Sequence, residues 1–331
     1  MRLKPAELDA SLARKLAPAY LVHGDEPLLA LEAADAIRAA ARKAGFTQRE
    51  VLEVDRYFDW SEFAHAAGSG SLFGDRKVVE VRLPTGKPAA AAVQALVAYC
   101  ERPNPDVLLL VTMPRPEGQW WKADWFVALE RLGAVVEVEP VARAALPAWL
   151  NARLARQKQS AQGEALEYLA ERVEGNLLAA HQEVQKLGLL APAGALSLEQ
   201  VQDAVTDVAR YEPAAAVEAL LAKDTARYVR VIEGLRAEGE APPLVLFVLA
   251  GALFVLQGLQ RGGSPDALFF QHRFFNKRLQ PLVQAAGRRF GAAAVTAALA
   301  HAALIDRASK GVDPADPWEE LVKLGLRLHQ V

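Results

Sequence analysis

The sequence predicts an α/β domain built on a parallel sheet, followed by two all-helical domains. Over the first 140 residues, short apolar runs of strand length alternate with segments of helical periodicity, which is the order that β-α units require. From about residue 141 the strand pattern disappears and only helical segments follow. The chain has 331 residues, of which 52% are apolar, so it is large and hydrophobic enough to fill more than one core.

The apolar runs of the first domain have the length and composition of strands, and the segments between them have helical periodicity. Strands that alternate with helices in this way form a parallel sheet with helices on both faces. The expected strands are 19–24, 50–55, 77–83, 107–112 and 134–139, and the expected helices are 27–44, 60–67, 88–101 and 122–132.

Two changes along the chain predict the domain boundaries. The strand pattern ends near residue 140, and the stretch "RYEPA" at 210–214 interrupts the helical segments that follow. We therefore expect an α/β domain over residues 1–140, a small helical domain over 141–209 and a larger helical domain over 210–331.

One segment of the last domain, "PPLVLFVLAGALFVLQGL" at 242–259, contains no charged residue. Its uninterrupted apolar run, Leu244 to Leu256, has 13 residues. A helix that crosses a membrane needs roughly 18 to 20. Pro242 and Pro243 suit the start of a helix. The segment therefore predicts a core helix with neighbours on nearly all sides, in a helical bundle or at an oligomer interface.

Charge and cysteine content exclude several classes of protein. A formal net charge of -2 excludes a globally basic nucleic-acid binder, so any affinity for DNA must be regional. The single cysteine, Cys100, cannot form an internal disulfide, and we expect a small buried side chain in a reducing compartment. The charged N-terminal segment lacks the apolar core of a signal peptide, which favours a cytoplasmic protein.

The strand, loop and helix at "YLVHGDEPLLALEA" stand where a nucleotide-binding protein would hold phosphate. A phosphate loop needs several glycines, a lysine and a hydroxyl, and this loop has only Gly24. Asp25 and Glu26 place negative charge at the same point. Asp25 as a helix cap, with Pro27 in the first turn, explains the stretch without a ligand.

Other catalytic patterns are missing from the sequence. The histidines are scattered without the spacing of a metal site, and no nucleophile elbow is present. We therefore expect no catalytic residues, no bound metal and no cofactor.

Five motifs in order resemble the delta subunits of the bacterial DNA polymerase III clamp loader. This resemblance implies an AAA+-like α/β domain without ATPase motifs, a small helical lid domain, and a helical collar domain through which five subunits assemble. The motifs are "AYLVHGDEPLLALEA", "GSGSLFGDRKVVEV", "VLLLVT", "VEGNLLAAHQEVQKLGLL" and "PWEELVKLGL".

The resemblance also implies partners and a missing activity. The partners are the sliding clamp (beta subunit), the ATPase subunits (gamma/tau), the delta-prime subunit, and primed DNA in the assembled complex, within the polymerase III holoenzyme. Intrinsic ATPase activity is not expected, because the loop after Gly24 lacks lysine and hydroxyl and the strand before Pro84 lacks an acidic pair. In "GNLL", Leu178 stands where related ATPase subunits carry a phosphate-sensing arginine.

By resemblance, Leu72 and Phe73 in "SLFG" are an apolar wedge that enters a pocket on the clamp and favours its open ring. Gly68, Gly70 and Gly74 surround the pair, which lets two apolar anchors project from the domain. The alternative is core packing, which is the commoner role of such a pair beside a strand.

Basic residues of the last domain are candidates for contact with DNA. Arg273, Lys277 and Arg278 alternate with aromatic residues, a pattern that can bind backbone and bases, and Arg307 and Lys310 are candidates for phosphate contacts. The alternative for this region is a solvated helix face over a buried phenylalanine seam. For the whole chain, the alternatives are an active P-loop ATPase of DNA metabolism with an irregular loop, and a helical scaffold without clamp contact.

Overall fold

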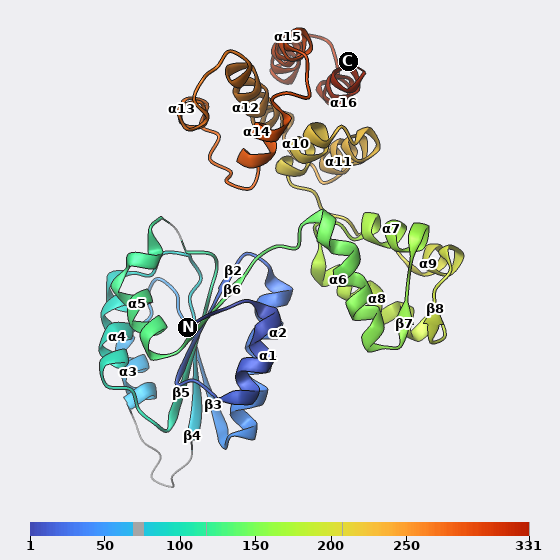
Figure 1. The fold of residues 1–331 in the computed structure, drawn as a ribbon. Coiled ribbons are helices and arrows are strands. Elements are labelled where there is room, and N and C mark those ends of the chain that lie inside the picture. Colours follow the sequence, from blue (N-terminus) through green and yellow to red (C-terminus); the bar gives the residue numbers. More distant parts are fainter. Residues whose placement is uncertain (69–75, 117, 207, 331) are drawn as a thin grey trace. The chain divides into compact units, whose positions relative to one another are not determined.

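A computed structural model describes residues 1–68, 76–116, 118–206 and 208–330 (Figure 1). The chain divides into two compact units, residues 1–142 and 143–331. The first unit is α/β and contains a parallel sheet, and the second is almost entirely helical. The fold class predicted from the sequence is confirmed. The further division of the helical region at residue 210 stays a prediction.

The first unit contains a six-stranded sheet with the strand order β1-β6-β2-β5-β4-β3, in which every pairing is parallel. Its two-residue strand β1 pairs with Val135 and Val136 and was not predicted, because so short a segment has no period. The strands are β1 (Arg2–Leu3), β2 (Ala19–Gly24), β3 (Phe46–Glu53), β4 (Arg76–Arg82), β5 (Val107–Met113) and β6 (Ala134–Val138).

Helices cover both faces of this sheet, as Figure 1 shows. On one face, buried side chains of α1 (Pro5–Arg14) and α2 (Pro27–Lys43) pack on Tyr20, Val22 and Leu108. On the other face, α3 (Trp60–Gly68), α4 (Ala90–Glu101) and α5 (Asp124–Leu132) pack on Leu21, Val79 and Leu109. Alternate residues of the central strands β2 and β5 thus enter two separate cores.

The second unit contains helices α6 to α16 and one short pair of parallel strands, β7 (Gln159–Ser160) and β8 (Gly194–Ala195). The sequence predicted no strand here. The helices are α6 (Leu146–Arg156), α7 (Gly163–Arg172), α8 (Leu177–Leu190), α9 (Leu198–Ala204), α10 (Pro213–Ala222), α11 (Thr225–Ala237), α12 (Pro242–Gln260), α13 (Pro265–Gln271), α14 (Gln280–Ala286), α15 (Ala292–Ser309) and α16 (Pro317–His329).

Helix α12 lies in the core of the second unit and contacts α10, α14 and α15. Within the described part of the chain it is the one helix long and apolar enough to cross a membrane, judged by length and composition alone. Val245, Leu249 and Leu253 are fully buried against its neighbours, which explains the apolar composition of that face. Leu244 and Phe247 on another face are exposed.

Candidate functional site

The loop between β2 and α2 lies where a nucleotide-binding protein would hold phosphate. Gly24 has a φ of 145°, and a Cβ atom at this position would lie 1.8 Å from the carbonyl oxygen of Val138 on β6. Only glycine tolerates this conformation and this close approach. The glycine therefore allows two strands to approach each other, which accounts for it without a ligand.

Two carboxylates occupy the start of α2. The cap is Glu26, whose side chain accepts a hydrogen bond from the Leu28 amide at 3.3 Å, so the prediction that Asp25 caps the helix was wrong by one residue. Asp25 instead accepts a hydrogen bond from the Arg115 backbone amide at 3.1 Å. Burial raises the pKa of Glu26, although the amide hydrogen bond opposes this shift. Acidic groups at the helix N-terminus occupy the position that a phosphate would need, which disfavours nucleotide.

The only carboxylate of strand β4, Glu80, is buried and has a structural role. It accepts hydrogen bonds from Arg38 of α2, Arg49 of β3 and Arg82 of β4, at 3.0, 3.0 and 2.9 Å. Burial opposes ionisation of Glu80, but the three guanidinium groups outweigh it and hold the pKa of this carboxyl below its ordinary value. Glu80 therefore joins α2 to the sheet and does not face a metal site. Among the described residues, no three His, Cys, Asp or Glu side chains are grouped to hold a metal ion.

The proposed wedge residues, Leu72 and Phe73, lie outside the described residues, but the elements that flank them are described. Helix α3 ends at Gly68, and the side-chain amide of Asn104 donates to the Ala67 carbonyl at 3.4 Å. Strand β4 begins at Arg76, so segment 69–75 leads into the amino-terminal edge of the parallel sheet. The loop after β2 lies at the opposite, carboxyl edge.

The start of β4 is firmly anchored. The Arg76 guanidinium lies 4.0 Å from the centre of the Phe46 ring and donates to the Ala44 carbonyl at 3.0 Å. The Lys77 amide donates to the Asp106 carbonyl at 2.9 Å. The segment 69–75 is therefore attached at both ends to ordered elements of the α/β unit.

The DNA candidates fall into two groups in the second unit. Arg273, Lys277 and Arg278 share the loop between α13 and α14, whereas Arg307 and Lys310 lie at the end of α15. Two of the five have acidic partners: Arg278 donates to Glu218 at 2.8 Å, and Lys310 donates to Asp306 at 2.8 Å. These carboxylates compete with phosphate for the two cations.

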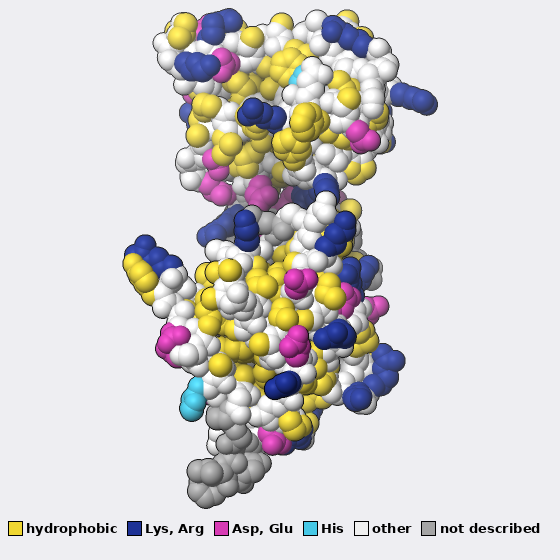
Figure 2. All heavy atoms as spheres, turned by 90° about the vertical axis from the view of Figure 1, so that its left-hand side faces the viewer, with side chains coloured by type: hydrophobic (Ala, Val, Ile, Leu, Met, Phe, Trp, Pro, Cys, Tyr) yellow, Lys and Arg dark blue, Asp and Glu magenta, His cyan; other side chains and the backbone are white. Residues whose placement is uncertain are grey.

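An apolar groove beside the α13–α14 loop was not predicted as a site. This cavity of about 420 Å³ is lined by the start of α10, the first half of α12 and residues 272–276. Its walls include Leu244, Phe247 and Phe275, which are 48%, 59% and 62% exposed. Figure 2 shows hydrophobic side chains gathered on one face of the second unit. Leu244 and Phe247 are one helical turn apart within the uncharged run, so they lie on the same face of the helix. This spacing was the sequence feature from which an apolar surface could have been predicted.

Comparison with known proteins gives a consistent result. Residues 20–139 match the family model described as DNA polymerase III, delta subunit. The chain is 33% identical over 291 residues to DNA polymerase III subunit delta of Escherichia coli, which covers 87% of this chain and 85% of that protein. It is 29% identical over 265 residues to the same subunit of Haemophilus influenzae, covering 78% and 76% of the two chains.

A solved structure has a similar fold. The clamp loader delta protein of Bacillus subtilis matches with a TM-score of 0.52 at 19% identity, over 99% of this chain and 100% of that one. At this identity the likeness concerns the fold alone.

Proposed function

Since this chain belongs to the family of DNA polymerase III delta subunits, we propose that it binds the ring-shaped sliding clamp and favours the open ring. The observation that carries the proposal is the 33% identity to a delta subunit over 87% of the chain. The "SLFG" motif between α3 and β4 supplies candidate contact residues, Leu72 and Phe73.

Binding energy alone is sufficient for this role. Two apolar side chains that enter a pocket on the clamp supply anchors of the kind that dominate protein interfaces. The ring opens only if the chain binds the open form more tightly than the closed form, because equal affinity for both shifts no equilibrium. The anchored ends of segment 69–75 support the proposal, because a wedge needs a fixed base from which to act.

We infer no ATPase activity for this chain. The loop after β2 carries Asp25 and Glu26 where phosphate would bind, and Glu80 on β4 is held by arginines. An active P-loop ATPase remains the competing function, and nucleotide titration distinguishes the two.

Assembly with the ATPase subunits and the delta-prime subunit is assigned to residues 210–331. The apolar groove supports this assignment, because contiguous exposed apolar surface marks sites of protein association. Within the assembled cytoplasmic complex, Arg273, Lys277, Arg278, Arg307 and Lys310 are the proposed contacts to the phosphates of primed DNA.

The direct test is binding of the purified chain to the sliding clamp from the same source. A stable complex without nucleotide is expected. If the unmodified chain shows no binding at micromolar clamp concentrations, the proposal is wrong and the helical scaffold remains.

A further inference from the structure

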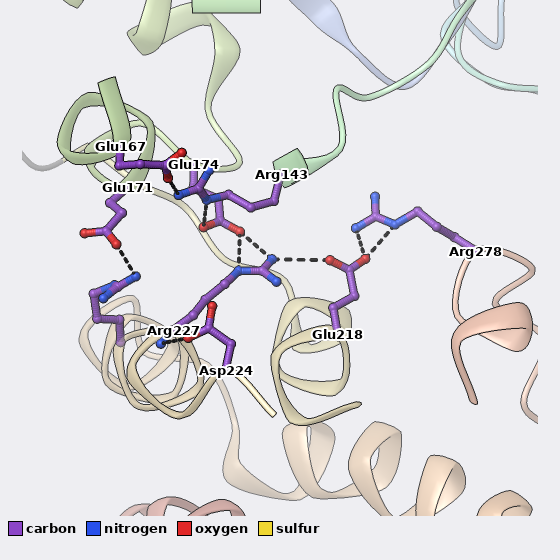
Figure 3. Close-up of polar contacts among 9 residues, drawn as sticks. Arg143, Glu167, Glu171, Glu174, Glu218, Asp224, Arg227 and Arg278 are labelled. Atoms are coloured by element: carbon purple, nitrogen blue, oxygen red, sulfur yellow. Dashed lines mark hydrogen bonds and ion pairs between the residues drawn. The ribbon is translucent and has the colours of Figure 1, made fainter. Parts of the chain in front are cut away.

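A buried ion pair connects two distant segments of the second unit (Figure 3). Glu174 lies in the turn between α7 and α8, and Arg227 lies in the first turn of α11. The Nε atom of Arg227 donates to Glu174 Oε1 at 3.0 Å, and a terminal nitrogen donates to the same oxygen at 2.5 Å. The two side chains are only 10% and 9% exposed, so the pair is shielded from water and salt.

The pair continues into further ion pairs on each side. Glu174 Oε2 lies 3.4 Å from Nε of Arg143, the first residue of the second unit. On the other side, Arg227 contacts Glu218 of α10 at 3.3 Å, and Glu218 accepts from Arg278 at 2.8 Å. Burial lowers the pKa of Arg227, but its bonds to the two carboxylates outweigh burial and raise it, so the guanidinium stays charged.

Residues 208 and 210, which precede α10, are held by backbone hydrogen bonds to the turn that carries Glu174. The Val208 amide donates to the Arg172 carbonyl at 2.8 Å, and the Arg210 amide donates to the Glu174 carbonyl at 2.8 Å. Gly175 has a φ of 75°, and a Cβ atom there would lie 1.8 Å from the Arg210 carbonyl oxygen. The ion pair and the connecting segment therefore depend on the same turn, residues 172–175.

We propose that Arg227 is a positioning residue that clasps helices α6–α9 to helices α10–α16, so that these two parts of the unit move as one body. A buried charged pair suits this role, because only a narrow range of geometries satisfies its hydrogen bonds, whereas apolar surfaces tolerate sliding. The consequence for the clamp loader rests on the proposed function. Assembly through residues 210–331 would also fix the orientation of helices α6–α9.

Hydrogen exchange of the full-length chain tests the clasp, with the Val208 and Arg210 amides as reporters. In Arg227→Met, exchange at both amides is expected to accelerate on the order of tenfold or more, because the segment opens locally once the clasp is lost. The amides of Val231 and Leu235, inside α11, report whether the helix itself stays folded. Glu174→Gln keeps the size of the side chain and is expected to give the same acceleration.

A matched control lies one turn along the same helix. Arg230 pairs with Glu171 at 2.7 Å, but these side chains are 38% and 35% exposed. In Arg230→Met the reporter amides are expected to stay within about twofold of the unmodified chain, since exposed pairs contribute little. Equal acceleration in this control would show a general loosening of α11 and overturn the proposal.

Each single variant leaves one buried charge without its partner, and this alone could accelerate exchange. The double variant Glu174→Gln with Arg227→Met distinguishes that effect from loss of the clasp. It contains neither charge of the central pair, so restored protection at Val208 and Arg210 would overturn the clasp, whereas continued acceleration supports it. Unchanged exchange in both single variants would also overturn it.

Clamp affinity of Arg227→Met is measured in parallel and should not change. If the unmodified chain fails to bind the clamp, the proposed function fails while the exchange result still stands.

Discussion

Removal of two phenylalanine rings from the apolar groove should weaken assembly much more than folding. Phe247 and Phe275 are 59% and 62% exposed in the isolated chain, so over half of each side chain is available to a partner. Full burial of such a side chain is worth about 1.5 to 3 kcal/mol, and the exposed share is therefore worth about 1 to 2 kcal/mol for each ring. If a partner covers the groove, the pair should therefore contribute about 2 to 4 kcal/mol to association.

The double variant Phe247→Ala with Phe275→Ala should therefore raise the Kd for the ATPase subunits by roughly 1.5 to 3 orders of magnitude. Isothermal titration calorimetry measures the affinity, and urea unfolding measures the smaller loss of stability from the buried share of each ring. Phe270 provides a matched control, because it is 78% exposed on α13 but does not line the groove. Unchanged affinity in the double variant, or an equal loss in Phe270→Ala, would refute the assignment of the groove to assembly.

Four further outcomes are expected. Leu72→Ala with Phe73→Ala should weaken clamp binding by roughly two to four orders of magnitude with an unchanged unfolding midpoint; a large drop in the midpoint would make the pair core residues. Calorimetric titration of ATP into the chain should give no heat of binding, and a micromolar site would restore the ATPase alternative. Arg273→Ala with Lys277→Ala should reduce the salt dependence of DNA binding by the assembled complex by a slope of about 2, and an unchanged slope would count against these contacts. Burial raises the pKa of Cys100 to about 11, so at pH 8 its thiol should react with Ellman's reagent far more slowly in the folded chain than in urea, and equal rates would contradict the buried position.

The sheet was predictable where strands are buried on both faces and unpredictable at its edges. In β2, residues 19–23 are all buried, and the apolar run at 19–22 placed the strand at 19–24, which are its bounds in the structure. Strand β3 begins at Phe46, four residues before the expected start, because its first half is exposed and polar at the sheet edge. An edge strand pairs with only one neighbouring strand and leaves part of its surface in water. Its sequence therefore lacks the continuous apolar run by which a buried strand is predicted.

The groove and the clasp could not be located from the sequence for a different reason, although the spacing of Leu244 and Phe247 indicated an apolar helix face. Both depend on contacts between residues distant along the chain, such as Glu174 and Arg227, which are 53 positions apart. Glu218 and Arg278, a further pair, are separated by 60 positions. A charged side chain is usually solvated, so the sequence alone favours the exposed interpretation for each of them. Only the packed unit shows which of these charges are withdrawn from water.

The two edges of the parallel sheet differ in what they offer to a ligand. Ligands of open α/β sheets bind at the carboxyl ends of the strands. At that edge, Gly24 packs against Val138, and Asp25 and Glu26 use their carboxylates on backbone amides, so a phosphate would meet negative charge instead of donors. Segment 69–75 connects to the opposite edge, between Gly68 and Arg76. A clamp bound there would interact with a part of the sheet that catalysis does not use, and its affinity would not depend on a nucleotide in the same unit. Under the proposed function, control by ATP would have to reach this chain from the ATPase subunits, through the helical unit.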